Sequence, residues 1–318
     1  MTKGIVKLGP AHFTQEASKE TFIEVVSRLK LKSPVIIKPN WSSSMIFSEA
    51  KILDWVLSAI DSEVLVVESY AAWRCALFLD KSVPKDDSLL TRLGRQTKED
   101  FRENDKWFLN ITRISDVLEK HSAEYVSLSE ELWAKRLSDS KIIEEAVLRK
   151  YDPLENEENY SIIPERVSEL QGGTLLNLTK PKRSLKAKHV SLSLKNLFGL
   201  IPSPWRGKYH GKNDQQLSPN IVDVNKVYHS LFDVKTVIEG VFTTSETIDN
   251  FLQPTIHRDM GLVWGSGDSL DLDALVTSQM GMNPHKVDYL DYANGRLGQW
   301  KEKTIVLGQH NLIEFPIQ

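Results

Sequence analysis

Four short apolar runs, each ending at charged residues, most strongly limit the folds open to this chain. They are rich in branched side chains and cover residues 35–37, 64–67, 174–178 and 234–238. A strand that is buried on both faces has this composition. Apolar stripes at helical spacing precede the first two runs, at 22–29 and 52–60. This alternation predicts an α/β fold with a mainly parallel sheet and helices on both faces.

Further helices and strands continue this alternation. Strands are predicted near 125–128, 262–264 and 304–307, and helices near 130–149, near 221–231 and from Asp268 onward. Charged inserts at about 79–110 and 130–165 interrupt the first half as helical or lid segments. Gly172 and Gly173 precede the strand at 174–178, which favours a lobe boundary there. We therefore expect an N-terminal α/β lobe over 1–170 and a C-terminal α/β lobe over 171–318 that completes the site.

Charged residues recur where the buried runs end. Lys38 and Asn40 follow the first run, Glu68 the second, Lys182 the third, and Glu239 the fourth. Ligands of open α/β sheets bind beyond the carboxyl ends of the parallel strands. Lys38, Glu68, Lys182, Lys195 and Glu239 should therefore surround one cleft. The alternative is that these charges are dispersed over the surface.

Two segments of the C-terminal half could complete such a site. Residues 194–201 suit one helical turn packed on the core, from which Lys195 and Asn196 would project rigidly. The basic loop 206–212 follows and reads either as a mobile clamp for a phosphate or carboxylate or as a solvated loop. The residues that we expect to bind substrate are Lys38, Asn40, Lys182, Asn196, Lys208 and His210.

The carboxylates suggest further chemistry. A glutamate at a strand end can act as a general base, and the predicted catalytic residues are Glu239, Glu68 and Lys195. Oxygen ligands also suit a divalent metal, for which the candidates are Glu239, Asp268 and Asp273. Helix capping explains Asp268 equally well. The phosphate-binding P-loop, the dinucleotide-binding glycine motif, the H-E-x-x-H zinc motif and the G-x-S-x-G nucleophile elbow are all absent from the sequence.

Composition narrows the class of protein. A net charge of -3 argues against nucleic-acid binding, which needs a basic face. The single cysteine, Cys75, cannot hold an iron-sulfur cluster with this chain's own thiolates. The chain shows no apolar signal segment and no apolar run long enough to span a bilayer, so we expect a cytoplasmic protein without membrane contact.

The string Lys195-Asn196-Leu197-Phe198-Gly199 is the most distinctive part of the sequence. Together with 36–40, Glu68, 177–182, 238–240 and 268–281, it resembles the domain of unknown function 362 family over residues 35–298. The resemblance implies an α/β fold. Many members carry ferredoxin-like iron-sulfur segments, which implies redox chemistry. This chain departs from that pattern in its single cysteine and in Arg183-Ser184, where the family often has a histidine.

These observations lead to two functional hypotheses. The first is an enzyme of unknown reaction that acts on a small anionic metabolite, a carboxylate or a phosphate. Its chemistry would be redox with a separate ferredoxin-like protein as electron partner, or metal-assisted group transfer. The second is a non-catalytic protein that binds an anionic ligand or serves as a scaffold for a redox partner.

Overall fold

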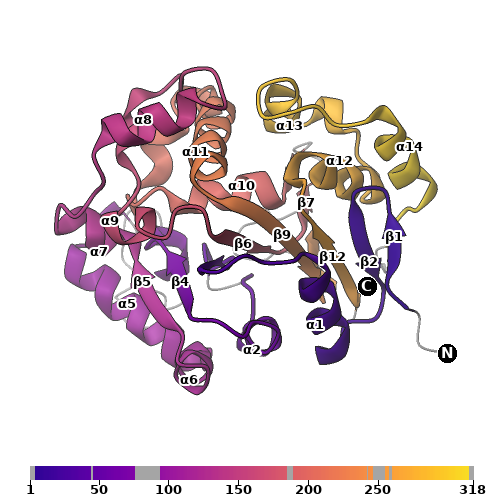
Figure 1. Cartoon of the computed structure of the whole chain (residues 1–318), viewed down its shortest axis with the longest axis horizontal. Helices are drawn as coiled ribbons and strands as arrows, with labels where there is room; N and C mark the ends of the chain where they lie inside the picture. The colour runs from indigo at the N-terminus through magenta and orange to yellow at the C-terminus, as the bar shows by residue number, and fades with distance from the viewer. Residues whose placement is uncertain are drawn as a thin grey trace, which may run out of the picture.

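The computed structural model describes residues 4–43, 46–75, 94–184, 189–241, 243–245, 255–257 and 260–314. Within these ranges, the strands form an eight-stranded sheet, which crosses the molecule (Figure 1), and a four-stranded sheet. None of the described helices combines the length and apolar composition needed to cross a membrane.

The large sheet is mixed, with a parallel centre. Its strand order is β1-β2-β12-β9-β6-β3-β4-β5. Neighbouring strands are parallel within the set β9, β6, β3, β4 and β5. The pairs β9–β12, β12–β2 and β2–β1 are antiparallel. The strands are β1 (Val6–Leu8), β2 (Ala11–Thr14), β3 (Val35–Lys38), β4 (Val64–Glu68), β5 (Glu124–Ser127), β6 (Thr174–Thr179), β9 (Asp233–Gly240) and β12 (Leu262–Ser266).

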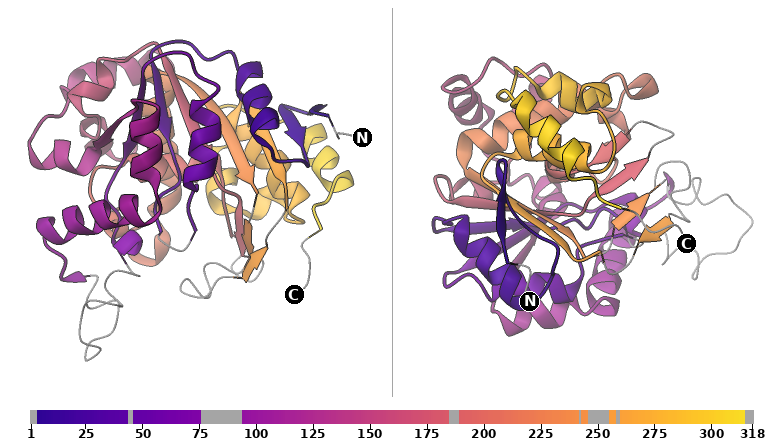
Figure 2. Two further views of the ribbon diagram at one scale, coloured as in Figure 1. Left: turned by 90° about the horizontal axis from the view of Figure 1, so that it is seen from below. Right: turned by 90° about the vertical axis from the view of Figure 1, so that its right-hand side faces the viewer.

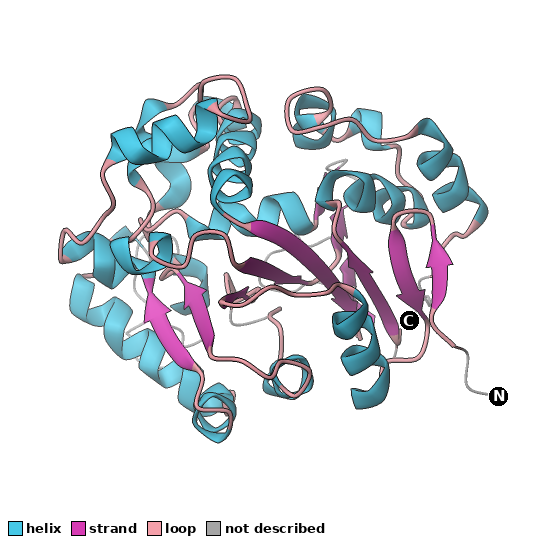
Figure 3. Ribbon diagram, viewed as in Figure 1, coloured by secondary structure: helices cyan, strands magenta, loops and turns pink. Residues whose placement is uncertain are grey.

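Both faces of this sheet are buried, which explains the apolar composition of its central strands. On β3, Ile36 packs into one apolar cluster, and Val35 and Ile37 pack into a second cluster on the opposite face. The first cluster includes side chains of α7 (Leu128–Trp133), α8 (Ser140–Leu148), α9 (Glu165–Ser168), α10 (Ser193–Leu197), α11 (Leu217–Leu231), α12 (Ser269–Gln279), α13 (Asp288–Ala293) and α14 (Glu302–His310). The second includes side chains of α1 (Lys19–Arg28), α2 (Ala50–Leu57), α5 (Lys98–Ile111) and α6 (Ile114–Lys120). Helices therefore cover both faces (Figure 3).

The small sheet continues two strands of the large one. Its order is β11-β10-β7-β8, and its strands are β7 (Lys182–Ser184), β8 (His189–Ser191), β10 (Thr243–Ser245) and β11 (Thr255–His257). Because β7 closely follows β6 and β10 closely follows β9, the small sheet lies beyond the carboxyl ends of the central strands (Figure 2). It brings Lys182 next to the edge where the site was expected.

The structure confirms the predicted α/β fold class and its mainly parallel sheet. The predicted helix at 130–149 is instead two helices, α7 and α8, because Lys135 adopts a left-handed φ of 58° and Asp139 caps a new helix. The hairpin of β1 and β2 was not predicted. Of the predicted insert at 79–110, residues 79–93 lie outside the described residues, and 98–111 form α5.

The strand predicted at 304–307 is wrong, because these residues belong to helix α14. Thr304, Ile305 and Gly308 are buried at helical spacing, whereas Val306 is 48% exposed. A Cβ atom on Gly308 would lie 2.6 Å from the backbone oxygen of Leu275, so glycine permits close packing of α14 on α12. The short run of branched residues thus suggested the two-residue period of a strand, whereas packing on α12 gives these residues the period of a helix.

Strands from both sides of the predicted lobe boundary alternate within the large sheet. β6 lies between β3 and β9, and β2 pairs with β12. The apolar cluster that contains Ile36 also draws on residues from Ala11 to Ile305. Residues 1–170 and 171–318 therefore do not form separate sheets, although both contribute to the carboxyl edge.

Candidate functional site

A buried ion pair closes the carboxyl ends of β3 and β4. Lys38 and Glu68 are the last residues of these parallel neighbours, so their side chains meet at the sheet edge. Lys38 Nζ lies 2.8 Å from Glu68 Oε2, and both side chains are 1% exposed. The backbone N–H groups of Trp41 and Ser69 also donate to the Glu68 carboxylate. Burial lowers the pKa of Lys38, and Glu68 opposes this shift.

A second buried pair lies at the ends of β6 and β9. Lys180 Nζ lies 2.8 Å from the Glu239 carboxylate, and both side chains are 0% exposed. Glu49, at the start of α2, lies 3.3 Å from the same ammonium group and is 29% exposed. Burial raises the pKa of Glu239 to about 8, and the positive charge of Lys180 opposes this rise.

Three asparagine side chains connect the strands to α10 and β7. The Asn177 amide donates to the backbone oxygen of Ser193 over 2.9 Å. The Asn196 amide donates to Asn177 Oδ1 over 2.7 Å, and the Asn40 amide donates to Asn196 Oδ1 over 3.1 Å. Lys182 Nζ then donates to Asn40 Oδ1 over 3.2 Å. These hydrogen bonds connect β6 to α10, α10 to Asn40 in the segment after β3, and Asn40 to Lys182 in the small sheet.

Lys182 and Lys195 differ from the two buried lysines in their partners. Lys195 Nζ lies 2.6 Å from Nε2 of His189, whose pKa burial holds well below its usual range, so the neutral ring accepts this hydrogen bond. Both lysines are half-buried, and among the described residues neither has a carboxylate within ion-pair distance. Burial lowers the pKa of Lys182 to about 7, helped by the charges of Lys195, Lys180 and Lys38. Burial also lowers the pKa of Lys195 to about 8.

The position of α10 is fixed from two sides. The carboxylate of Asp273, on α12, accepts the backbone N–H groups of Ser193 and Leu194 over 3.0 and 2.9 Å and the Ser193 hydroxyl. It therefore caps the first turn of α10, whose N-cap residue Leu192 has no side-chain acceptor. On the other side, a Cβ atom on Gly199 would lie 3.1 Å from Lys38 Nζ. The glycine thus lets the turn after α10 approach the Lys38–Glu68 pair.

The structure brings together Lys38, Asn40, Glu68, Lys182, Lys195, Asn196 and Glu239 at the carboxyl edge. That they surround an open cleft stays a prediction. Two side chains of the basic loop 206–212, the predicted clamp for an anion, have partners elsewhere. Lys208 is exposed and pairs with Glu158 over 2.9 Å, whereas His210 pairs with Asp214 over 2.7 Å and packs its ring on Phe198.

The predicted metal ligands do not come together. Glu239 pairs with Lys180, Asp268 accepts the backbone N–H of Asp271 as the N-cap of α12, and Asp273 caps α10. In the part of the chain that the structure describes, no group of three or more His, Cys, Asp or Glu side chains could hold a metal ion. The prediction failed because helix capping uses both aspartates.

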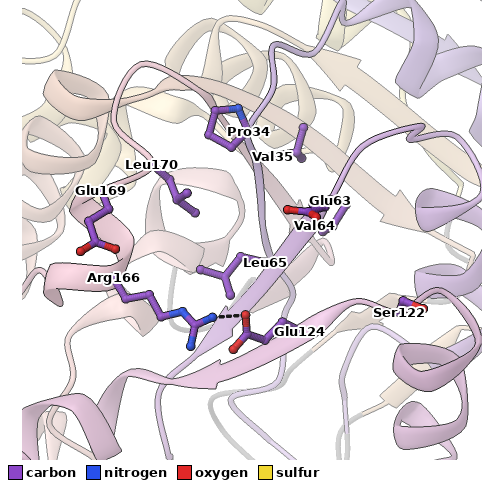
Figure 4. A pocket seen from close by; sticks show the side chains of 10 residues that line it. All are labelled: Pro34, Val35, Glu63, Val64, Leu65, Ser122, Glu124, Arg166, Glu169 and Leu170. Carbon is purple, nitrogen blue, oxygen red and sulfur yellow. Dashed lines mark hydrogen bonds and ion pairs between the residues drawn. The ribbon is translucent and has the colours of Figure 1, made fainter.

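A pocket of about 520 Å³ lies at the opposite edge of the sheet, against the amino ends of β3, β4 and β5 (Figure 4). Val35, Val64 and Leu65 are apolar residues of its lining, which also contains the ion pair between Glu124 and Arg166. None of the site residues predicted from the sequence lines this pocket. This pocket and the lysine cluster are therefore separate features.

Sequence reasoning missed three residues of the cluster. Asn177 was counted as part of an apolar run, although a buried amide inside a strand signals a required hydrogen bond. Lys180 stands two residues before Lys182 and could have been found from the same strand-end rule. His189 lies between the predicted site residues Lys182 and Lys195 in the sequence, but no local signal marked it.

The fold and the edge cluster define an α/β protein with a lysine-rich polar site at the carboxyl ends of its parallel strands. Residues 160–278 match the model of a family described as a domain of unknown function (DUF362), which confirms the family resemblance. The match includes Lys180, Lys182, Lys195, Asn196 and Glu239, but it is shorter than the span of 35–298 expected from the motifs. The chain matches no curated protein and no solved structure.

Proposed function

We propose that this protein is an enzyme that acts on a small anionic metabolite, a carboxylate or a phosphate, bound at the carboxyl edge of its sheet. One observation carries the proposal. Lys182 and Lys195 contact only neutral groups among the described residues, while the nearby carboxylates of Glu68 and Glu239 are already paired with Lys38 and Lys180. Partly buried ammonium groups without counter-ions are stabilised by an anionic ligand.

The residues of the cluster take different roles in this proposal. Lys182 and Lys195 hold the anion, and Asn40 and Asn196 fix the geometry around it. Glu239 exchanges a proton with the substrate, because burial raises the pKa of its carboxyl group to about 8, against the opposing charge of Lys180, and so brings that pKa close to neutral pH. Lys38 and Glu68 hold the strand ends and the turn after α10 in place. Electrons for a redox reaction would come from a separate ferredoxin-like protein, because this chain has one cysteine.

A non-catalytic anion-binding protein is the second candidate. The ion pairs of the two buried carboxylates favour this candidate. Glu68 is paired with Lys38 and Glu239 with Lys180, so neither carboxylate is free to act as a base. The same lysines would then bind a ligand without any chemistry. In that case the protein would serve as a sensor, a carrier or a scaffold for a redox partner.

Calorimetric titration with sulfate and with inorganic phosphate tests the shared anion site. We expect both anions to bind, and Lys182→Met and Lys195→Met to weaken binding by about tenfold or more, as for loss of one charged hydrogen bond. Lys135→Met is the matched control, because Lys135 is exposed on the loop after α7 and should not affect the anions. Equal binding by all four proteins would overturn the proposed site.

Glu239→Gln separates the enzyme from the binding protein. The full chain and the variant are incubated with a mixture of anionic metabolites, and depletion of each compound is followed by mass spectrometry. An enzyme that uses Glu239 should deplete a substrate only with the original side chain, while both proteins still bind sulfate. Depletion of no compound by either protein, with sulfate binding intact, would favour the non-catalytic candidate.

A further inference from the structure

The orientation of Asn40 follows from a backbone group three hydrogen bonds away. The backbone oxygen of Ser193 can only accept, so the Asn177 amide must direct its NH₂ group toward it. Asn177 Oδ1 then accepts from Asn196, and Asn196 Oδ1 accepts from Asn40. This leaves Asn40 Oδ1 facing Lys182 Nζ at 3.2 Å. The chain of amides thus presents a neutral acceptor to the lysine in one fixed orientation.

A neutral acceptor holds a lysine without favouring its charged form as a carboxylate does. An amine and an ammonium group can each donate one N–H to Asn40 Oδ1, so the contact survives loss of a proton. The carboxylates that could stabilise the ammonium form are held by Lys38 and Lys180. Burial together with the charges of Lys195, Lys180 and Lys38 lowers the pKa of Lys182 to about 7. About half of Lys182 is then an uncharged amine at pH 7, against about one in 3,000 for an ordinary lysine.

Lys195 lies in a different environment. Its ammonium group donates to the neutral His189 ring over 2.6 Å, and the negative charge of Asp214 opposes the effect of burial. Its pKa is lowered to about 8, so it remains mostly protonated at pH 7. The two lysines therefore offer a nucleophilic amine and a fixed positive charge in the same site.

From this arrangement we infer that Lys182 is a nucleophile that forms an imine with an anionic carbonyl compound of the 2-oxo acid class, while Lys195 binds the substrate carboxylate. The inference rests on the proposed anion site and names its substrate class and its covalent step. A desolvated lysine beside other cationic groups is the arrangement that activates an amine toward carbonyl carbons. Asn40 acts as a positioning residue that holds the amine without charging it.

The step balances without an oxidant or a reductant. The lone pair of Lys182 Nζ forms a bond to the carbonyl carbon, and the carbonyl π electrons move to the oxygen, which takes up a proton. The nitrogen loses a proton, and the resulting carbinolamine loses water to give the imine. One molecule of water is released, and the imine nitrogen can then accept electrons from a bond that breaks at the adjacent carbon.

Reductive trapping with pyruvate tests the inference on the full chain. The protein is incubated at pH 7 with pyruvate and sodium cyanoborohydride, and labelled lysines are located by peptide mass spectrometry. We expect the initial rate of labelling at Lys182 to exceed that at exposed Lys135 by at least about tenfold, given its larger amine fraction. L-Lactate, which has the carboxylate but no carbonyl group, should compete with pyruvate.

The outcomes separate this inference from the proposed function. Lactate and sulfate binding without trapping at Lys182 would overturn the imine and leave the anion site standing. Failure of every anion to bind would overturn both. Trapping at Lys195 instead of Lys182 would overturn the assignment of the nucleophile.

Asn40→Asp gives an independent test of the positioning role. An ionised carboxylate in place of the amide should raise the pKa of Lys182. We expect the pH midpoint of the labelling rate to rise by about one unit and trapping at pH 7 to fall by about fivefold, with labelling restored near pH 9. Circular dichroism and the thermal midpoint establish that the variant is folded. An unchanged pH profile in a folded variant would contradict the role of Asn40.

Discussion

The four lysines of the edge cluster differ in their partners, and this difference decides what each can do. Lys38 and Lys180 are fully buried and each contacts a buried glutamate at 2.8 Å. Such pairs hold strand ends together, because removal of one partner leaves a buried charge uncompensated. Lys182 and Lys195 are half-buried and contact Asn40 and His189 instead. Their charge is therefore available to a ligand.

The pH dependence of sulfate affinity is a prediction at this scale. Burial lowers the pKa of Lys182 to about 7 and that of Lys195 to about 8, so both are ammonium groups at pH 6 and mostly amines at pH 9. Since an anion binds the charged forms, affinity should fall as the pH rises, by about tenfold or more over this interval. Sulfate keeps its charge throughout, so calorimetric titration reports the protein alone.

The controls for this prediction follow from the two pKa values. Lys182→Met should remove the decline centred near pH 7 and keep the one near pH 8. Lys195→Met should remove the decline near pH 8 and move the remaining decline above pH 7, because the charge of Lys195 helps to lower the pKa of Lys182. An affinity that stays constant or rises from pH 6 to pH 9 would contradict the assigned titrations.

At the scale of elements, α10 is a short helix whose position depends on a longer one. Its five residues could not form a stable isolated helix. Asp273 on α12 accepts two backbone N–H groups of its first turn, and Asn225 on α11 donates to the backbone oxygen of Leu194 over 2.9 Å. Lys195 and Asn196 are thus held in place by contacts from two helices.

Asp273→Ala should destabilise the protein more than loss of an ordinary helix cap. It leaves two buried N–H groups of α10 without their acceptor and opens a cavity, for which we expect a loss of about 2–4 kcal/mol in the free energy of unfolding. Asp268→Ala is the matched control, because Asp268 is an exposed N-cap of α12 whose loss costs about 1 kcal/mol. Urea denaturation measures both.

Sulfate affinity adds a second measurement for the same pair of variants. Because Asp273 fixes α10, Asp273→Ala should also weaken sulfate binding through Lys195, whereas Asp268→Ala should not. Equal losses of stability and of affinity in the two variants would show that Asp273 has no special role in placing α10.

At the scale of the whole molecule, the two halves of the chain interleave within one sheet. β6 from the second half separates β3 from β9, and the hairpin of β1 and β2 from the first half pairs with β12. The apolar cluster that covers one face of the sheet contains residues from both halves. The polar site also draws on both halves of the chain. Lys38 and Asn40 come from the first half, and Lys182 and Lys195 come from the second.

A fragment of residues 1–170 should therefore not fold by itself. It would expose the edge of β3 that pairs with β6, and its β1–β2 hairpin would lose β12. We expect no cooperative urea transition by far-UV circular dichroism and strong binding of an apolar dye, in contrast to the full chain. A sharp, cooperative transition in the fragment would show that it is an independent lobe after all.

Prediction from the sequence worked best where one local pattern had one physical explanation. The run at 35–37 is apolar at consecutive positions because β3 is buried on both faces, so its conformation could be read directly. Residues 304–307 have a similar composition but form part of α14, since packing of Gly308 against α12 decided between two periods that a short run cannot distinguish. The aspartates at 268 and 273 looked like a metal site, and each caps a helix.

The sequence by itself determined the fold class, the edge of the sheet that carries the polar residues, and the family of residues 160–278. The burial of a strand and the position of its end are local properties, so a few consecutive residues are enough to predict them. The tertiary structure alone decided which carboxylate pairs with which lysine, and that Asn40 faces Lys182 across 142 positions of sequence. Those contacts depend on the order of strands in the sheet and on the seating of α10. Charge pairing therefore followed from topology, which no short stretch of sequence specifies.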